Sequence, residues 1–399
     1  MHSARSSLRF RPRAHGPAPR RARTHASILV VVIITILFAS VALVGFVEKA
    51  TNDLMIDTRV ALAQRLRREA YSSLEVTLAV LQNFNQVNGG LRSPAEGWDD
   101  PLGFAGWSPS EGITAEVSFE DESGKLSLPH VDAATLQNLF QSWDLSISDS
   151  QRLTDAVMGW MHKDYVATTT EAPDYENSAL PYTTPLRSLR SYSELAAIDI
   201  ARDLLYDENG VPNDRWHRFV DSLSLFDFKQ TNVNGGRPDV YTALGSLDPS
   251  QQRQLSDYLH GTGSRASMGP GYFQSANDAA GIIGAGTMPS GYGTTISALR
   301  INITLHQGRT AYHLSAVVAP QNGAKTVQTT ATAANATTDN QTPSGAAAGT
   351  TNATSTTNAQ STVAKTAQPA ALNYPFTLLE IRENTEISSA PPPSTPPQA

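Results

Sequence analysis

Residues 27–47 read SILVVVIITILFASVALVGFV, and they decide the fold because none of these 21 residues is charged or is Pro, Asn or Gln. At a rise of 1.5 Å per residue, about 20 apolar residues cross the hydrocarbon core of a bilayer. A helix that is apolar all round is rare in a soluble protein. A cleaved secretory h-region is usually about 7–15 residues long, whereas this run continues directly into EKATNDLM. We therefore expect an uncleaved membrane anchor that runs from Ser27 to Val47.

Charge is distributed unevenly on the two sides of this anchor. Residues 1–26 contain seven Arg and no acid, whereas residues 27–399 contain 23 basic and 37 acidic residues, a formal charge of −14. Because Lys and Arg favour the cytoplasmic side, we expect a single pass with a cytoplasmic N-terminus and an exported C-terminal part. An acidic exported part argues against nucleic-acid binding. The chain has no Cys, which excludes disulfide scaffolds, thiolate zinc sites and Cys nucleophiles.

The helix is expected to continue beyond the membrane. Leu62, Leu66, Ala70, Leu74 and Leu78 recur every four residues, and polar residues lie between them. This pattern is typical of a helix that packs one face on a core. No Pro or Gly interrupts residues 47–84. The sequence therefore predicts one helix over residues 27–84, half in lipid and half packed on an exported domain.

The exported part changes between strand and helix periodicity. Alternating apolar residues predict strands at 113–120, 125–128, 299–306, 309–318 and 374–382, with a two-residue turn at Gln307-Gly308. Helical periodicity predicts helices at 132–143, 148–164, 191–206, 213–226 and 249–260. The proposed N-cap residues are Asp132, Ser148, Ser191, Asn213 and Asp248. We expect an α+β fold in which the long N-terminal helix packs on an antiparallel sheet, with an all-helical domain inserted in that sheet.

The chain is expected to consist of consecutive segments. The predicted segments are a basic leader (1–26), the long helix (27–84), the first part of the sheet (85–129), the inserted helical domain (130–290), a sheet hairpin (291–320), a low-complexity insert (321–371), a final strand (372–384) and a Pro-rich tail (385–399). The insert and the tail contain almost no large apolar residues, so we expect both to be disordered.

Four stretches of the chain resemble one protein family. HASILVVVIITILFASVAL resembles a prepilin-peptidase site followed by the apolar helix of type IV pilin-like proteins. The other three are EVSFEDESGKLSL, the run RLTDAVMGWMHKDY with APDYENSALPY and PLRSLRSYSELAAI, and TNVNGGRPDVYTALGSLDPSQQRQLSDYL. Their order over about residues 25–320 resembles the minor pseudopilin K of bacterial type II secretion systems, also called general secretion pathway protein K.

The resemblance implies a structural role and a set of partners. It implies cleavage by a prepilin peptidase between Ala26 and Ser27, and methylation of the new terminus, although the family usually has Gly at the position of Ala26. It also implies an inner-membrane protein with a periplasmic domain at the tip of the pseudopilus, where it caps or initiates assembly. The implied partners are the minor pseudopilins I and J, the major pseudopilin and the inner-membrane assembly platform.

Val31 would be the fifth residue of the mature chain. Major pilins carry Glu at this position, where it pairs with the free amine of the next subunit, whereas member K typically lacks it. A tip subunit has no neighbour above it, so a carboxylate there would be unpaired in lipid. Val31 therefore favours a place at the tip over a place in the shaft.

The residues that could carry chemistry give little support for catalysis. His130, His162, His217 and His260 lie in different predicted elements, and the Gly-rich stretch 281–293 lacks the strand and helix that a dinucleotide fingerprint needs. We therefore expect no enzymatic activity.

Calcium is the ligand that the sequence favours most, although no cofactor is required. Asp207, Asn209 and Asp214 surround one turn, and Asp174 and Glu176 form a second group. Calcium takes six to eight oxygen ligands, and neither stretch follows the EF-hand pattern. Capped helix ends and solvated turns are the alternative explanation.

The sequence is also compatible with two alternatives to a pseudopilin. One is a signal-anchored exported DNA-binding protein, because residues 232–259 resemble a helix-hairpin-helix element, although they offer only Arg237 and Arg253 against three Asp. The other is a minor pilin of a type IV pilus.

Overall fold

A computed structural model describes residues 23–169, 175, 182–245, 247–284, 288, 290–327 and 375–384. The chain divides into two compact units, residues 1–65 and 66–399. Residues 1–22 of the expected leader, residues 328–371 of the expected insert and the expected tail at 385–399 lie outside the described residues.

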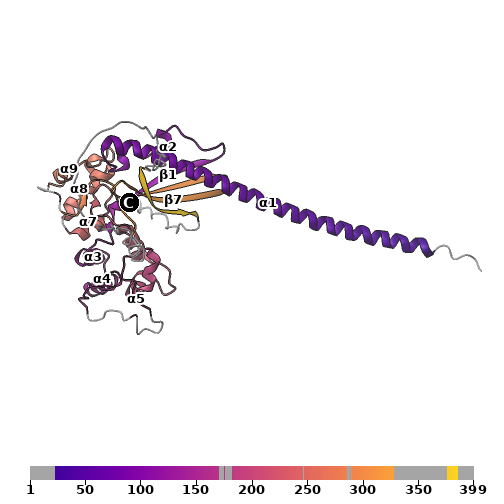
Figure 1. Ribbon diagram of the computed structural model, residues 1–399, viewed down its shortest axis with the longest axis horizontal. Coiled ribbons are helices and arrows are strands. Elements are labelled where there is room, and N and C mark those ends of the chain that lie inside the picture. The colour runs from indigo at the N-terminus through magenta and orange to yellow at the C-terminus, as the bar shows by residue number, and fades with distance from the viewer. Residues whose placement is uncertain are drawn as a thin grey trace, which may run out of the picture. The chain divides into compact units, whose positions relative to one another are not determined.

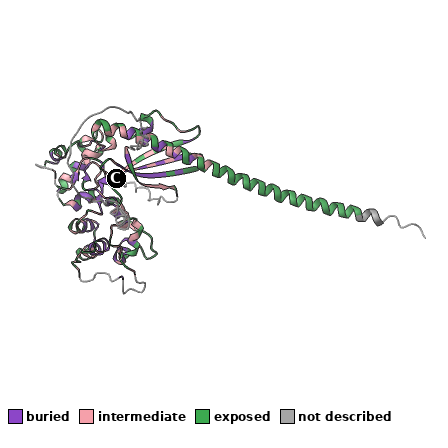
Figure 2. Ribbon diagram, viewed as in Figure 1, coloured by how far each residue is buried: buried purple, intermediate pink, exposed green. Residues whose placement is uncertain are grey.

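The first unit contains the apolar part of helix α1, which runs as one helix of 66 residues over Arg23–Asn88. It is longer than the predicted 27–84 at both ends. Figure 2 shows its N-terminal part exposed throughout, and the apolar side chains from Ile28 to Val47 are between 45% and 71% exposed. Apolar side chains that face outward in this way suit a hydrocarbon environment, where the backbone of a helix satisfies its own hydrogen bonds.

The second unit is built on a four-stranded antiparallel sheet with the order β1-β6-β7-β8. Its strands are β1 (Thr114–Asp121), β6 (Leu299–Gln307), β7 (Thr310–Pro320) and β8 (Phe376–Glu383). β1 and β6 are neighbours, although the helical region separates them in sequence (Figure 1). The prediction of helices inserted in an antiparallel sheet is therefore confirmed.

Residues 66–88 of α1 cover one face of this sheet. Leu66, Ala70 and Leu74 of the predicted stripe are buried, as is Leu81 further along the helix. The alternate residues of β6 that begin at Leu299 are buried as well. At the sheet's edge, the Arg67 guanidinium donates to the Glu383 carboxylate of β8 at 2.8 Å. The amphipathic stripe is thus confirmed as the packing face of the helix.

The region between β1 and β6 is mainly helical, as predicted. Its longer helices are α3 (Ala133–Gln141), α4 (Ile147–Met161), α5 (Asp199–Leu205), α6 (Asp214–Ser222), α7 (Pro238–Leu244), α8 (Pro249–His260) and α9 (Ala276–Ile282). Asp132, Asn213 and Asp248 cap α3, α6 and α8 as expected, and Asp248 forms a capping box with Gln251. Two short helices precede β1, η1 (Pro94–Glu96) and α2 (Pro101–Phe104), and η2 (Glu122–Gly124) follows β1. The helical region also contains two short helices, η3 (Tyr192–Ala197) and η4 (Gly263–Arg265).

Several predicted boundaries are wrong. The cap of α4 is Ser146, whose hydroxyl accepts from the Asp149 N–H, rather than Ser148. The helix predicted at 191–206 is two helices, η3 and α5, because Ile198 is extended between them. The β6–β7 hairpin pairs Gln307 with Thr310, so its two loop residues are Gly308 and Arg309. Gly308 has a φ of 62°, which explains why Gly occupies the first loop position.

Two short parallel strand pairs were not predicted. β2 (Leu126–Ser127) pairs with β3 (Leu223–Ser224), and β4 (Thr231–Asn232) pairs with β5 (Tyr292–Gly293). The strand expected at 125–128 therefore does not join the main sheet, because η2 turns the chain away after β1. Likewise the helix predicted at 213–226 ends at Ser222, and the following residues form β3.

The helical region has a core of its own. Trp143, Phe140 and Phe219 lie at its centre, with ring centroids 5.1–6.3 Å apart. A second cluster around Tyr258 and Phe273 holds α8 and α9, with centroids 4.4 Å apart. Aromatic pairs at such distances add about 0.5–1.5 kcal/mol each beyond the area that they bury.

Candidate functional site

Two of the sequence stretches that resemble the pseudopilin family meet in the interior of the second unit. EVSFEDESGKLSL supplies β1, η2 and β2, and TNVNGG supplies β4 and the turn after it. The Asp121 carboxylate accepts from the Ser123 backbone N–H at 2.9 Å and from the Asn232 side-chain amide at 2.6 Å. The Asn232 amide also donates to the Arg92 carbonyl at 2.9 Å. We call Asp121, Ser123, Gly124, Asn232 and Gly235 the buried junction.

The junction also connects to the main sheet. The Ser123 hydroxyl accepts from the Ser297 N–H at 2.9 Å, and the Ser123 N–H donates to the Ala298 carbonyl at 3.2 Å. Since Ser297 and Ala298 lead directly into β6, one Ser links the end of β1 to the start of its neighbour. The junction thus joins the sheet, the turn after β1 and the segment that precedes α7.

Two glycines of the junction have no space for a side chain. A Cβ on Gly124 would lie 2.2 Å from the Gly235 carbonyl oxygen, and a Cβ on Gly235 would lie 2.2 Å from the Asp121 carboxylate. Such distances are far below van der Waals contact. The close approach of the two turns therefore requires Gly at both positions.

A network of buried charges lies next to the junction. Glu122 and Lys125 are both less than 3% exposed, and Lys125 Nζ lies 3.2 Å from Glu122 Oε2 and 2.9 Å from Glu120 Oε1. Arg300 on β6 donates to Glu122 Oε1 at 2.7 Å. Arg237, which precedes α7, pairs with Glu120 at 3.0 Å and with Asp221 at 2.8 Å. The network links β1, β6, α6 and α7 by ion pairs.

The pKa values of the two buried acids move in opposite directions. Burial raises the pKa of Asp121 to about 7, although hydrogen bonds from Ser123 and Asn232 favour its charged form. Burial alone would raise the pKa of Glu122 as well. The positive charges of Lys125 and Arg300 outweigh the effect of burial and lower this pKa to about 2. Only Glu122 has cationic partners in direct contact, which explains the difference.

Asp155 on α4 anchors the loop that follows this helix, and sequence reasoning did not single it out. Its buried carboxylate accepts from the Tyr165 hydroxyl at 2.6 Å and from the Thr169 N–H at 2.7 Å. Burial raises the pKa of Asp155, but these hydrogen bonds outweigh it and lower the pKa below its ordinary value. The only sequence signal for this role of Asp155 was its position in the stretch RLTDAVMGWM, because a Tyr and two Thr that could bond it follow this stretch.

The first candidate calcium group has another role in the structure. One Asp207 carboxylate oxygen accepts from the Asn209 N–H at 2.9 Å and the Val211 N–H at 2.8 Å, so it closes the turn after α5. Asp214 lies in the first turn of α6. Asp174 and Glu176 lie outside the described residues. Within the described part of the chain, no group of three or more His, Asp or Glu side chains could hold a metal ion. Calcium stays a prediction.

The helix-hairpin-helix-like element consists of α7 and α8, joined around Gly245 with a φ of 65°. Its α7 packs on α3, where the Trp143 indole donates to the Asp239 carboxylate at 3.1 Å. Arg237 is held in ion pairs with Glu120 and Asp221. The element therefore uses its charges in contacts within the protein.

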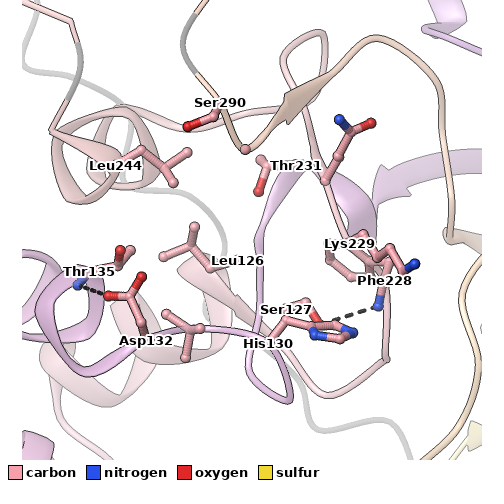
Figure 3. Close-up of a pocket in the computed structure, with 13 residues that line it drawn as sticks. Leu126, Ser127, His130, Asp132, Thr135, Phe228, Lys229, Thr231, Leu244 and Ser290 are labelled. Atoms are coloured by element: carbon pink, nitrogen blue, oxygen red, sulfur yellow. Dashed lines mark hydrogen bonds between the residues drawn. The ribbon is translucent and has the colours of Figure 1, made fainter.

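Figure 3 shows the residues that line a cavity between α3, β2 and the segment around Lys229. The volume of this cavity is about 340 Å³. Three of its polar side chains, Asp132, Ser127 and His130, have partners in the protein. Asp132 accepts from the Thr135 N–H at 2.7 Å, Ser127 bonds the backbone of residues 226 and 228, and His130 pairs with Asp227. No nucleophile and base face each other across this cavity among the residues that line it.

The predicted anchor and cleavage residues lie on α1. Ala26 and Ser27 are within its first turns, and Val31 and Val47 are 57% and 52% exposed. From Ile28 onward this is the one described helix that is long and apolar enough to cross a membrane. The described residues thus contain a single N-terminal segment that suits a membrane anchor.

Comparisons with known proteins bear on the same region. Residues 120–208 match the family model described as type II secretion system (T2SS), protein K. Among solved structures, the chain is similar to one in "The Crystal Structure of the GspK-GspI-GspJ complex from enterotoxigenic Escherichia coli Type 2 Secretion System". That similarity has a TM-score of 0.48 and 10% identity, and it covers 67% of this chain and 95% of the other. No curated protein matches the chain. The matched stretch from Glu120 to Glu208, which contains Asp121, Glu122, Lys125 and Asp155, is similar to protein K of type II secretion systems.

Proposed function

We propose that this chain is a minor pseudopilin that caps the tip of a type II secretion pseudopilus and helps to initiate its assembly. The observation that carries the proposal is the match of residues 120–208 to protein K of this system. The same chain carries an apolar N-terminal helix and an antiparallel sheet, the parts that a pilin-like subunit needs. The protein acts by assembly rather than by catalysis.

The buried junction supports a cap that behaves as one body. Ser123 and Asp121 connect the sheet to the segment before α7, and Arg237 connects β1 to α6. Buried hydrogen bonds and ion pairs hold elements in one arrangement, because breaking them exposes unpaired polar groups to a low dielectric. A force applied to the helical region would therefore pass to the sheet.

The proposed partners follow from the family. They are the minor pseudopilins of types I and J, the major pseudopilin, the prepilin peptidase and the inner-membrane assembly platform. The seven Arg of residues 1–26 favour a cytoplasmic N-terminus, which leaves the C-terminal domain in the periplasm.

The two alternatives receive less support. A DNA-binding role would need cations free to reach phosphates, and Arg237 is already paired with Glu120 and Asp221. A type IV pilus would make a match to a secretion-system family unexpected.

Cleavage by a prepilin peptidase tests the proposal. Co-expression with the peptidase should remove the leader and yield a mature chain that begins at Ser27, as read by mass spectrometry of the N-terminal peptide. Ala26→Gly should be cleaved at least as completely, because it restores the residue usual in the family. The same gene should restore secretion in a strain that lacks its own protein K. A mature terminus elsewhere, or no cleavage of either chain, would show that the assignment is wrong.

A further inference from the structure

A cleft lies between the sheet and the helical region, on the face of the sheet opposite α1. It has a volume of about 490 Å³. One wall contains Tyr192 from η3 with Trp216 and Val220 from α6, and the other includes Asn302 of β6 and Asn384 just after β8. The lining also contains charged side chains, namely Glu120, Glu122, Lys125, Asp221, Arg300 and Arg382. Trp216 and Val220 are only half-buried, and the Tyr192 and Trp216 ring centroids are 6.4 Å apart. The cleft thus pairs an aromatic wall with a polar and charged wall.

The polar wall offers a hydrogen-bond donor to an incoming backbone. The Asn302 side-chain oxygen accepts from the Ser315 hydroxyl at 2.7 Å, which leaves its NH₂ group as the available donor. Within the described residues, this NH₂ group has no hydrogen-bond partner. Aromatic rings beside amide donors are the surface that recognises polyproline II segments, whose carbonyl groups make no internal hydrogen bonds.

The chain itself leaves the described part of the structure in this cleft. Asn384 accepts from the His313 N–H at 2.9 Å, and its φ of 41° ends the strand in the left-handed region. Residues 391–397 follow as PPPSTPP. Pro391 is seven residues beyond Asn384, and a fully extended chain spans at most about 3.3–3.6 Å per residue, so its reach is about 25 Å.

We propose that the Pro-rich segment 391–397 of this chain docks in the cleft lined by Tyr192, Trp216 and Val220. Pro rings stack on the aromatic wall, and the Asn302 amide donates to a carbonyl of the segment. Because the segment is tethered at the edge of its own site, its effective concentration there reaches the millimolar range. The tethered segment therefore fills the cleft even if its affinity as a separate peptide is weak. The docked segment holds α6 and η3 against the sheet.

Photo-crosslinking of the full chain in detergent micelles tests the position of the segment. A benzoylphenylalanine in place of Thr395 should crosslink to peptides that contain Tyr192, Trp216 or Val220, as identified by mass spectrometry. A matched chain carries Ser at all five tail prolines (Pro391→Ser, Pro392→Ser, Pro393→Ser, Pro396→Ser, Pro397→Ser) and should lose at least four-fifths of that crosslink. Mixing isotopically light and heavy copies separates crosslinks within one chain from crosslinks between two. Crosslinks elsewhere, between copies, or equally strong in both chains would overturn the proposal.

A competition experiment provides the second readout. A synthetic peptide APPPSTPPQA is titrated into both full chains and followed by tryptophan fluorescence. It should bind the chain with the serine tail and bind the unaltered chain at least tenfold more weakly, because the tethered segment competes. Val220→Ser in the serine-tail chain should weaken the binding of the peptide. Phe104→Ser, which changes an exposed position on α2, should leave the binding of the peptide unchanged. No binding to the serine-tail chain, or equal binding to both chains, would show that the cleft does not hold the tail. Neither result bears on leader cleavage, so this proposal and the proposed function fail separately.

Discussion

At the scale of single residues, the molecule depends on a few charged side chains far from water. Glu122 and Lys125 are three residues apart, whereas Arg300 comes from β6, and both cations form ion pairs with Glu122 in the interior. Taking a charge out of water costs several kcal/mol, and the cost is recovered only while its partners are present. The sequence stretch DESGKL showed a polar turn, but nothing in it indicated that Arg300 would be the third member.

Removing Arg300 should therefore have a large effect. Arg300→Met keeps an apolar stem but leaves Glu122 with fewer partners, and we expect a loss of about 3–5 kcal/mol in the free energy of unfolding. Arg202→Ala is the control, because its pair with Asp199 is about half exposed and worth at most about 1 kcal/mol. Urea denaturation of both variants in detergent measures the difference. Equal losses would show that the buried network does not stabilise the fold.

Asp121 should make stability depend on pH. Its pKa is about 7 in the folded protein and 3.8 in an unconstrained chain, so the folded state binds the proton more tightly. The contribution of Asp121 to the free energy of unfolding is therefore greatest below about pH 4. It falls as the pH rises to about 7, by about 4 kcal/mol at most. Asp121→Asn should lack this slope, although it is less stable overall because Asn232 then faces a second amide donor. Parallel pH profiles of the two proteins between pH 4.5 and 7.5 would contradict the prediction.

At the scale of elements, local sequence determines some boundaries of helices and strands, and tertiary contacts determine others. The caps Asp132, Asn213 and Asp248 were predictable, because a capping side chain bonds a backbone N–H only two or three residues away. The break at Ile198 and the parallel pair of β2 with β3 were not, since both depend on what packs against them. A strand of two residues carries no periodicity that a sequence could reveal.

The turn after β1 gives an element-scale prediction. Gly124→Ala would place a Cβ against the Gly235 carbonyl, so we expect a loss of at least about 1–3 kcal/mol in stability. Gly159→Ala lies within α4 with nothing within 4 Å of the new Cβ, and should stabilise the helix by up to about 1 kcal/mol. Thermal unfolding of the two variants under one condition compares them. A Gly124→Ala protein as stable as the unaltered chain would show that the two turns can separate.

At the scale of the whole molecule, the N-terminal helix decides where the protein works. Val31 is exposed on a helical segment that has no charged residue between Ser27 and Val47. Val31→Glu places a carboxylate in the hydrocarbon region, which costs about 2.5–3.5 kcal/mol when it has no partner. We expect secretion by a complemented strain to fall severalfold, while Val31→Leu leaves it unchanged. Improved secretion with Glu would indicate a neighbour above that pairs with the carboxylate, and hence a place in the shaft rather than at the tip.

The sequence by itself determined the apolar helix, its amphipathic continuation, the alternation of β1, β6 and β7, and the order of helices between them. These features repeat over a few residues, so each stretch carries its own signal. Only the tertiary structure decided that Asp121 meets Asn232, that Glu122 meets Arg300, and that Tyr192 and Trp216 face Asn302 across a cleft. These contacts join residues about 80 to 180 positions apart. Burial makes such pairings favourable, and burial is a property of the assembled chain rather than of any stretch within it.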